Sequence, residues 1–523
     1  MKKIISIFLT IILTCCSDSN SAISEDTNAK IRDYITECNQ KKLPVLLKEK
    51  FGSNLKGIKL DRMQIETLIL NGVNIQGASF KKAEIKKLEF VDVDLSGSDW
   101  SDAKILEIKF TNSNAVKSSF EEAQLSSIKI EGSKFKGAAF TGASLLSGSF
   151  ANSNFAESSF ERAQISNLKS SSNFYNSSDF SKAQISNAEF ESDNFYGAKI
   201  SCKINDVKFN KLFMESVDFS DSTIFQLNVN NSNLANMLML GASIDESSFE
   251  DCEMTSSYIY NTTFNLVNLN NCLLNGINFS KSNFKNMDFT KADLSSASMN
   301  TIEGNYINIK DTIATNIMLD SVTFANINIT GSKMNKSTMR SFGVLALTAS
   351  DLELSGSEII SWNCQNCNFS NVDLSKTSIS GALFDQIHMS NMMMFQASIL
   401  NLSINNSSLD KIMFNYSQIL NSSASNTTFT NIQSEKNVAI GNKNFENLEG
   451  KNPITDIKII DTKSNYSYYN FSNMDFNNLR FDGASFKGAI FNSSGFAGAI
   501  FTNTDFSNAS FKDANLDSAS FIS

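Results

Sequence analysis

Large apolar residues return at every fifth position along most of the chain. One stretch that shows the spacing contains Phe80, Ile85, Phe90, Leu95, Trp100, Ile105 and Phe110. The residue two places before each of them is usually small, as Ala78 and Ala83 are. A helix requires an apolar spacing near 3.6 and an ordinary strand alternates in twos, so neither explains a period of five. The pattern therefore predicts a repeat protein.

The period of five occurs in three segments of the chain, each with its own register. It runs from Leu60 to Ile200, restarts one residue early at Ile204 and continues to Ser434, and returns from Phe471 to Phe521. Residues 435–469 do not follow it. We therefore expect a main array of repeats at 57–434, an insertion loop at 435–469 and further C-terminal repeats at 470–523.

Units such as Gln76-Gly77-Ala78-Ser79-Phe80 and Lys291-Ala292-Asp293-Leu294-Ser295 resemble the A(D/N)LXX motif of the pentapeptide-repeat family. The resemblance implies an all-β solenoid, a right-handed quadrilateral (four-sided) parallel β-helix with one pentapeptide on each face. It also implies that the large central residue and the small residue two before it point inward. With four units in each coil, the repeats would form about 22 stacked coils. Stacking would bury apolar residues that a single coil leaves exposed.

Several units fit this pattern poorly. Gly304, Ala314 and Ala349 are small residues at central positions, whereas Trp362 stands where a small residue is expected. We expect thin packing or local distortion there, most of all from Gly304 to Trp362.

The N-terminus is predicted to be a lipoprotein signal peptide at residues 1–16. Lys2 and Lys3 are followed by an apolar stretch that is too short for a permanent membrane-spanning helix. The order Leu13-Thr14-Cys15-Cys16 resembles a bacterial lipobox. This resemblance implies lipid attachment at Cys16, with Cys15 as the fallback acceptor. A plain secretory signal is the alternative, and in either case we expect the mature protein to leave the cytoplasm.

Two further segments precede the repeats. Residues 17–28 are polar and are expected to form a flexible tether, and residues 29–56 are expected to form a helical cap over the first coil. Ile31, Tyr34, Ile35 and Cys38 follow helical spacing and are expected to form one apolar stripe, with Asp26 or Thr27 as the expected N-cap. A second short helix is expected from Pro44 to Phe51. The last coil has no evident cap, so it is a possible homodimer contact.

The sequence offers little catalytic chemistry. Its single histidine, His388, directly precedes the central Met389 and is expected to be an isolated surface residue. We predict no catalytic residue, no cofactor and no metal site, and hence no enzyme. Cys364 and Cys367 have a spacing that can bind metal or carry out redox chemistry, but both fall on inward positions, as do Cys202, Cys252 and Cys272. Buried core thiols are the favoured interpretation, and a disulfide between Cys252 and Cys272 is conceivable.

The surface is the remaining source of function. The formal net charge is −9, and outward positions are mainly Ser, Asn and Thr. No basic stripe is present, so nucleic-acid binding is not expected. One acidic cluster is interpreted as a solvated face, with a site for a cation or a basic partner as the alternative. It contains Asp245, Glu246, Glu250, Asp251 and Glu253.

These features favour a non-enzymatic envelope lipoprotein that acts as a rigid scaffold for an unidentified protein partner. It would be bound to the membrane through its N-terminal lipid, with secretion as an alternative destination. The second hypothesis comes from the family resemblance, since some pentapeptide-repeat proteins mimic duplex DNA and bind or protect DNA gyrase. That function requires a dense carboxylate surface and a cytoplasmic location, and the sequence shows neither clearly.

Overall fold

A computed structural model describes residues 21–414, 417–420, 422–431, 438–440, 445–446, 458–460, 468, 471, 476–477 and 480–522. The chain divides into two compact units, Met1–Ser248 and Phe249–Ser523. Both units consist mainly of short parallel strands.

The first unit begins with helix α2 (Glu25–Lys41), whose N-cap is Ser24. The Ser24 hydroxyl accepts a hydrogen bond from the Thr27 backbone N–H at 3.2 Å. The helix therefore starts earlier than the expected caps Asp26 and Thr27, and it includes residues predicted to be tether. Three residues of the predicted stripe are buried, Ile31, Ile35 and Cys38, whereas Tyr34 is only partly buried.

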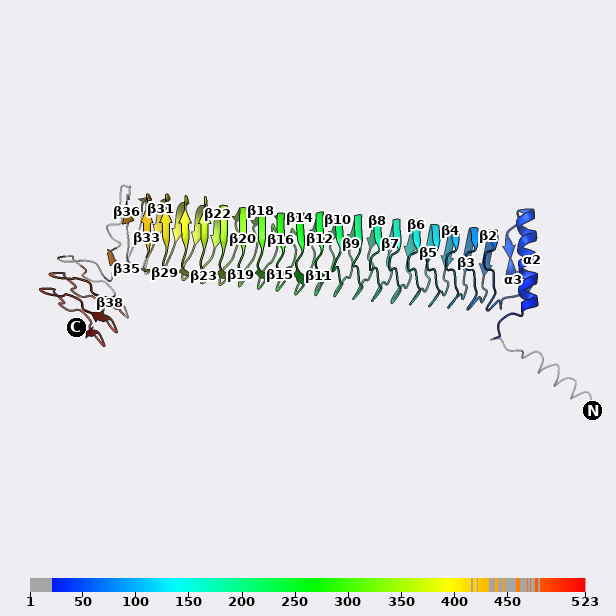
Figure 1. Ribbon diagram of the computed structural model, residues 1–523, viewed down its shortest axis with the longest axis horizontal. Coiled ribbons are helices and arrows are strands. Elements are labelled where there is room, and N and C mark those ends of the chain that lie inside the picture. Colours follow the sequence, from blue (N-terminus) through cyan, green and yellow to red (C-terminus); the bar gives the residue numbers. More distant parts are fainter. Residues whose placement is uncertain are drawn as a thin grey trace, which may run out of the picture. The chain divides into compact units, whose positions relative to one another are not determined.

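Helix α2 covers the backbone edge of the first coil (Figure 1). The Asn28 amide donates to the Lys59 carbonyl at 3.1 Å, and the Asn39 amide donates to the Gln64 carbonyl at 2.5 Å. The Asn39 carbonyl oxygen in turn accepts the Glu66 N–H at 3.0 Å. These side chains replace the hydrogen bonds that a preceding coil would supply.

The expected second helix is shorter than predicted. Strand β1 (Val45–Leu46) pairs with β2 and is followed directly by helix α3 (Leu47–Phe51). Pro44 therefore precedes a strand instead of opening the helix.

The strands of the first unit stack in parallel, each on the next coil (Figure 1). They are β2 (Gln64–Asn71), β3 (Glu84–Val91), β4 (Lys104–Thr111), β5 (Gln124–Glu131), β6 (Ser144–Ala151), β7 (Gln164–Ser171), β8 (Gln184–Glu191), β9 (Lys203–Asn210), β10 (Thr223–Asn230) and β12 (Ser243–Glu250). Strand β11 (Leu238–Leu240) belongs to a separate sheet. Ile85 pairs with Ile105, twenty residues later, so one coil contains four pentapeptides. Gln184 pairs with Lys203, nineteen residues later, where the sequence drops one residue.

The second unit has parallel pairing at the same offset, in two rows of strands. The first row contains β14 (Thr263–Asn268), β16 (Asn283–Asp288), β18 (Glu303–Lys310), β20 (Thr323–Thr330), β22 (Gly343–Glu353), β24 (Asn363–Gln365), β25 (Asn368–Asp373), β27 (Leu383–Asp385), β28 (His388–Met393), β30 (Ser403–Asn405), β31 (Ser408–Met413), β33 (Ser423–Ser425), β34 (Thr428–Thr430) and β36 (Phe445–Glu446). The second row contains β13 (Tyr258–Tyr260), β15 (Asn278–Ser280), β17 (Ser298–Asn300), β19 (Met318–Asp320), β21 (Thr338–Arg340), β23 (Glu358–Ile360), β26 (Ser378–Ser380), β29 (Ser398–Leu400), β32 (Gln418–Leu420), β35 (Val438–Ile440) and β37 (Lys458–Ile460). Near the C-terminus lie β38 (Arg480–Asp482), β39 (Ile500–Thr502) and β40 (Ser520–Ile522).

The chain is thus a parallel β-solenoid, as predicted. Its right-handed winding and four-sided section stay predictions of the family resemblance. Within 435–469, the described strands β35 and β37 pair at the usual twenty-residue offset, Val438 with Lys458. The rest of the segment predicted as an insertion loop lies almost entirely outside the described residues.

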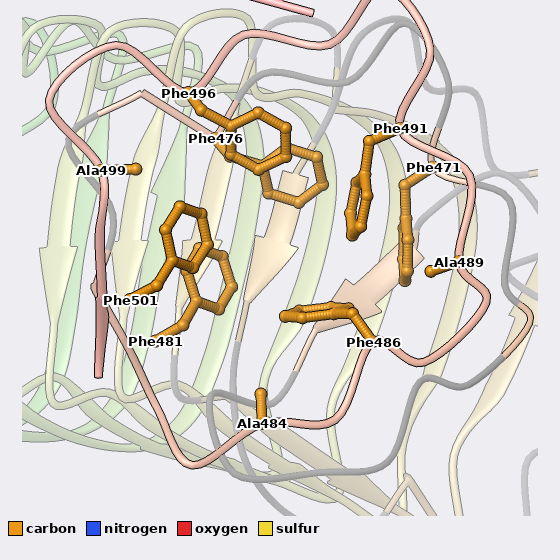
Figure 2. Close-up of a cluster of buried hydrophobic side chains, with 10 residues drawn as sticks. All are labelled: Phe471, Phe476, Phe481, Ala484, Phe486, Ala489, Phe491, Phe496, Ala499 and Phe501. Carbon is orange, nitrogen blue, oxygen red and sulfur yellow. The ribbon is translucent and has the colours of Figure 1, made fainter. Parts of the chain in front are cut away.

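Aromatic rings stack along the inside of the coils. Phe80 and Trp100 are almost parallel, with ring centroids 3.8 Å apart, and Phe120 and Phe140 stack at 5.0 Å. In the second unit, Phe481 stacks on Phe501 at 5.0 Å within a cluster of phenylalanines and alanines (Figure 2). Central and small residues therefore both point inward, as the period of five predicted.

The core is thin where the sequence predicted it to be. A small void with a wholly apolar lining includes Ala314 and Trp362 among its wall residues. A methyl group at Gly304 would meet the Phe324 ring at 2.7 Å, so that ring already occupies part of the space beside the glycine. Within the described residues, the Trp362 Nε1 has no hydrogen-bond partner. The misplaced indole therefore lies in an apolar environment beside unfilled volume.

One inward column of the first unit is polar. In each coil a backbone N–H donates to the side chain of the equivalent residue in the next coil, through Ser113, Ser133, Ser153, Asn173 and Asp193. The column ends at Asp193, whose Oδ1 accepts the Asn173 N–H at 2.6 Å. Asp193 is fully buried, and its Oδ2 has no partner among the residues described.

Candidate interaction surfaces

Outward amide side chains are hydrogen-bonded to one another from coil to coil. Asn328 Nδ2 donates to Asn308 Oδ1 at 3.0 Å, and Asn391 Nδ2 donates to Asn371 Oδ1 at 2.6 Å. Strand pairing places residues twenty positions apart directly above one another. An Asn that recurs at this spacing therefore contacts the Asn of the neighbouring coil. Much of the polar surface is therefore held in fixed positions by its own contacts.

Charged side chains of the first unit pair in the same way. Lys86 lies 2.7 Å from Glu66, and Lys109 lies 2.9 Å from Glu89. Glu189 lies between Lys169 and Lys208, at 3.6 and 3.5 Å. Such exposed pairs add little stability, but they neutralise carboxylates that would otherwise form an acidic row.

The predicted acidic cluster follows one stretch of chain. Asp245, Glu246 and Glu250 lie on β12, and Asp251 and Glu253 follow it. Gln226 Nε2 donates to the Glu246 carboxylate at 3.0 Å, whereas Asn268 Nδ2 donates to Glu250 at 3.3 Å. Neutral neighbours thus satisfy these two carboxylates. No group of three or more metal-ligating side chains that could hold an ion occurs in the described ranges.

An exposed aromatic patch in the first unit was not predicted from the sequence. Phe174, Tyr196 and Phe213 are 52%, 45% and 40% exposed. Phe174 and Phe213 both pair with Asn194 of the intervening coil, and the Tyr196 and Phe213 rings stack at 6.2 Å. Each aromatic residue stands next to a central position in the sequence. Aromatic residues at positions outside the period of five are the sequence feature that predicts an exposed aromatic patch.

Two hydrogen bonds define the middle of this aromatic patch. Asn194 Oδ1 accepts the Tyr196 N–H at 2.9 Å and the Asn176 amide at 3.1 Å. In the column of Phe174, Asn194 and Phe213 the amide therefore lies between two aromatic residues, and Tyr196 belongs to the same coil as Asn194.

His388 is exposed, as predicted, but it is not isolated. Its Nδ1 lies 2.6 Å from the Ser408 hydroxyl oxygen in the next coil.

The prediction of free thiols at Cys364 and Cys367 is wrong. These residues form a disulfide with their Cα atoms 6.1 Å apart. A central position and the next small slot both point inward, so a spacing of three residues brings the two sulfur atoms together. Cys202, Cys252 and Cys272 are buried free thiols, as the sequence indicated.

The predicted lipid-attachment residues Cys16 and Cys15 lie outside the described residues. Within the part of the chain that is described, none of the helices combines the length and apolar character needed to cross a bilayer.

The family model described as pentapeptide repeats matches this chain in eight copies, at residues 263–300, 354–391 and 496–522. The curated proteins contain no match to the chain.

Several solved structures are similar over part of their length. HetL, a pentapeptide repeat protein involved in heterocyst differentiation regulation from the cyanobacterium Nostoc sp. strain PCC 7120, is 17% identical, with 47% of this chain and 89% of HetL covered and a TM-score of 0.16. QnrB1, a plasmid-mediated fluoroquinolone resistance protein, is 18% identical, with 32% and 83% covered and a TM-score of 0.16.

The PL6 family alginate lyase AlyGC is 7% identical, with 89% and 96% covered and a TM-score of 0.15. TM-scores this low carry no conclusion about function. The eight matched copies agree with the period of five and the twenty-residue coil. Residues 263–300, 354–391 and 496–522 therefore carry pentapeptide repeats.

Proposed function

We propose that this protein is a non-enzymatic interaction scaffold of the bacterial cell envelope, exported and anchored to a membrane by a lipid on Cys16. The aromatic patch of Phe174, Tyr196 and Phe213 is the observation that carries the scaffold function. Exposed aromatic rings are costly on a surface built from hydroxyl and amide groups, and such rings are typical anchors of protein interfaces.

The coils beneath the patch support this function. Phe174 and Phe213 lie on backbone that is hydrogen-bonded to the coils on both sides, as in the bond from Phe155 N to Phe174 O at 2.7 Å. A partner would therefore meet a surface that is already ordered. Binding to such a surface costs less conformational entropy than binding to a mobile loop.

Photocrosslinking in living cells tests the scaffold proposal. We expect a photoreactive phenylalanine analogue at Tyr196 to capture a protein partner. The same analogue at Lys104, which is exposed on β4 several coils away, should capture none or much less. The variants Phe174→Asn and Phe213→Asn should abolish capture, because Asn194 already occupies this column between the two rings. Equal capture at both positions, or capture that survives both substitutions, would refute the proposed surface.

The anchor requires a separate test. Incorporation of a labelled fatty acid should occur in the wild-type chain and disappear in Cys16→Ala. Label that persists in Cys16→Ala but is lost in Cys15→Ala would move the attachment to Cys15. A wild-type chain without label would eliminate the lipid anchor while leaving the scaffold proposal standing.

The DNA-mimic function is the alternative, and the charge arrangement of the first unit disfavours it. Lys86, Lys109 and Lys208 each lie against a carboxylate, so carboxylates do not form a continuous row there. A gyrase supercoiling assay decides this point. Stoichiometric inhibition by the purified chain would favour the mimic over the scaffold.

A further inference from the structure

A shallow groove runs along one side of the second unit. It follows the break between the two strands of each coil, between β24 and β25, β27 and β28, and β30 and β31. Its volume is about 650 Å³, within the range of small-molecule sites. The groove lining consists of Asn366, Cys367, Asn368, Gln386, Ile387, His388, Asn406, Ser407, Ser408 and Asn426.

The lining forms three columns with one residue from each coil. Asn366, Gln386 and Asn406 form one rim, and Cys367, Ile387 and Ser407 form the buried floor. Strand pairing aligns Asn368, His388 and Ser408 along the other rim. Equivalent groups therefore repeat about every 4.8 Å along the groove.

Hydrogen bonding differs between the ends of the groove. Asn406 Nδ2 donates to Asp385 at 2.9 Å, and the side chain of Asn426 donates to Asn406 at 3.1 Å. The side-chain amides of Asn366, Asn368 and Gln386 have no partner in the part of the chain that is described. Elsewhere in this unit, stacked amides such as Asn391 and Asn371 bond to each other. At the end of the groove formed by Asn366, Asn368 and Gln386, the side-chain amides are therefore available to donate and accept hydrogen bonds with a ligand.

The charge of the lining limits the ligand. All ten lining residues are amides, hydroxyl residues, apolar residues, one cysteine of the disulfide or His388. The lining itself has no carboxylate, lysine or arginine, and the Asp385 carboxylate beside it already accepts the Asn406 amide. The backbone groups of β27 and β28 are already paired with strands on both sides, so a peptide cannot add as another strand.

We propose that this groove binds a neutral oligosaccharide. Sugar hydroxyls both donate and accept hydrogen bonds, which matches the open amides of Asn366, Asn368 and Gln386. His388 directs Nδ1 to Ser408 and leaves its second ring nitrogen for the ligand. This site goes beyond the protein scaffold and does not depend on it.

Calorimetric titration of the full chain with chitohexaose and cellohexaose tests the site, with hexagalacturonate as the charged comparison. We expect binding of at least one neutral sugar and not of the charged one. The double variant Asn366→Gly and Gln386→Gly should weaken binding by about tenfold or more, because it removes two hydrogen-bonding groups. Both residues have positive φ, 56° and 55°, so glycine preserves the backbone.

Asn326→Gly is the matched control, since Asn326 has φ 51° at the equivalent position outside the groove. It should leave the affinity unchanged, and circular dichroism should show that all variants fold. Absence of binding to both neutral sugars would overturn the proposal. It would also be overturned if the control weakened binding as much as the double variant, or if the groove bound only peptides.

Discussion

The Asp193 carboxyl occupies an inward slot that Ser113, Ser133 and Ser153 fill in earlier coils of the same column. Its burial raises the pKa to about 7, and the hydrogen bond from the Asn173 N–H opposes the rise only partly. Tyr175 and Glu191 are the titratable groups facing it, and the Glu191 charge raises the pKa further. In the preceding coil, Asn173 at the same slot donates to the Phe150 carbonyl at 2.9 Å. An amide or a protonated carboxyl is therefore suited to the slot, whereas a carboxylate is not.

Stability of the first unit should fall as pH rises from about 4 to about 7. The folded state binds the Asp193 proton more tightly than the unfolded state, in which the pKa is near the ordinary aspartate value of 3.8. The free energy of unfolding is thus highest below the unfolded pKa, and the loss is complete above the folded one. A shift of this size corresponds to about 4 kcal/mol at most. Urea unfolding at pH 4, 5, 6 and 8 measures it.

The variant Asp193→Asn should remove this pH dependence and raise the unfolding midpoint at pH 8. Asp92→Asn is the control, because Asp92 is exposed. Its pH profile should match that of the wild type. A wild-type slope that survives in Asp193→Asn would assign the pH dependence to other groups.

The buried thiol of Cys202 should be inert in the folded chain. Burial raises its pKa to about 12, so almost no thiolate is present near neutral pH. We expect iodoacetamide to label Cys202 only after unfolding, as mass spectrometry of the digested chain would reveal. Cys364 and Cys367 should stay unlabelled even in the unfolded chain until a reductant is added. Rapid labelling of native Cys202 would contradict its burial.

At the scale of elements, the period of five was enough to predict coils, strands and inward residues. These features depend on residues that are close together within one repeat. The same pattern occurs in many coils, so it can be recognised from the sequence. The Cys364–Cys367 disulfide and the start of α2 at Ser24 depend on particular contacts in three dimensions, so the repeat did not reveal them. The aromatic patch was missed for a related reason. Phe174 and Tyr196 stand beside central positions, and the period of five does not constrain which residue occurs there.

The cap α2 should protect the first coil through individual side chains. Asn39 both donates to Gln64 O and accepts from Glu66 N, so Asn39→Ala removes two hydrogen bonds at the exposed edge. We expect the amide of Glu66 to exchange with solvent about fivefold to tenfold faster, a change near 1 kcal/mol. Amides of β6 should keep their rates. Thr36→Ala is the control, because the Thr36 hydroxyl bonds within the helix to the Arg32 carbonyl.

At the scale of the molecule, each unit is held together by contacts between successive coils. A large cavity in one coil should therefore weaken its neighbours more than distant coils. Phe140 stacks on Phe120 and Phe160, so Phe140→Ala should cost about 3–5 kcal/mol. Hydrogen exchange should accelerate most in the coils around residues 120–160 and least in β2. Uniform acceleration throughout the first unit would show global cooperativity instead.

The nineteen-residue step between β8 and β9 has a consequence for assembly of the stack. Coils of identical length can slide past one another by a whole turn and still align their side chains. A coil of nineteen residues does not fit such a shifted pairing. If it were paired with the wrong coil, the strands on one side of it would be displaced by one residue and their side chains would no longer align. The one short coil thereby restricts the stack to a single pairing of coils as it forms.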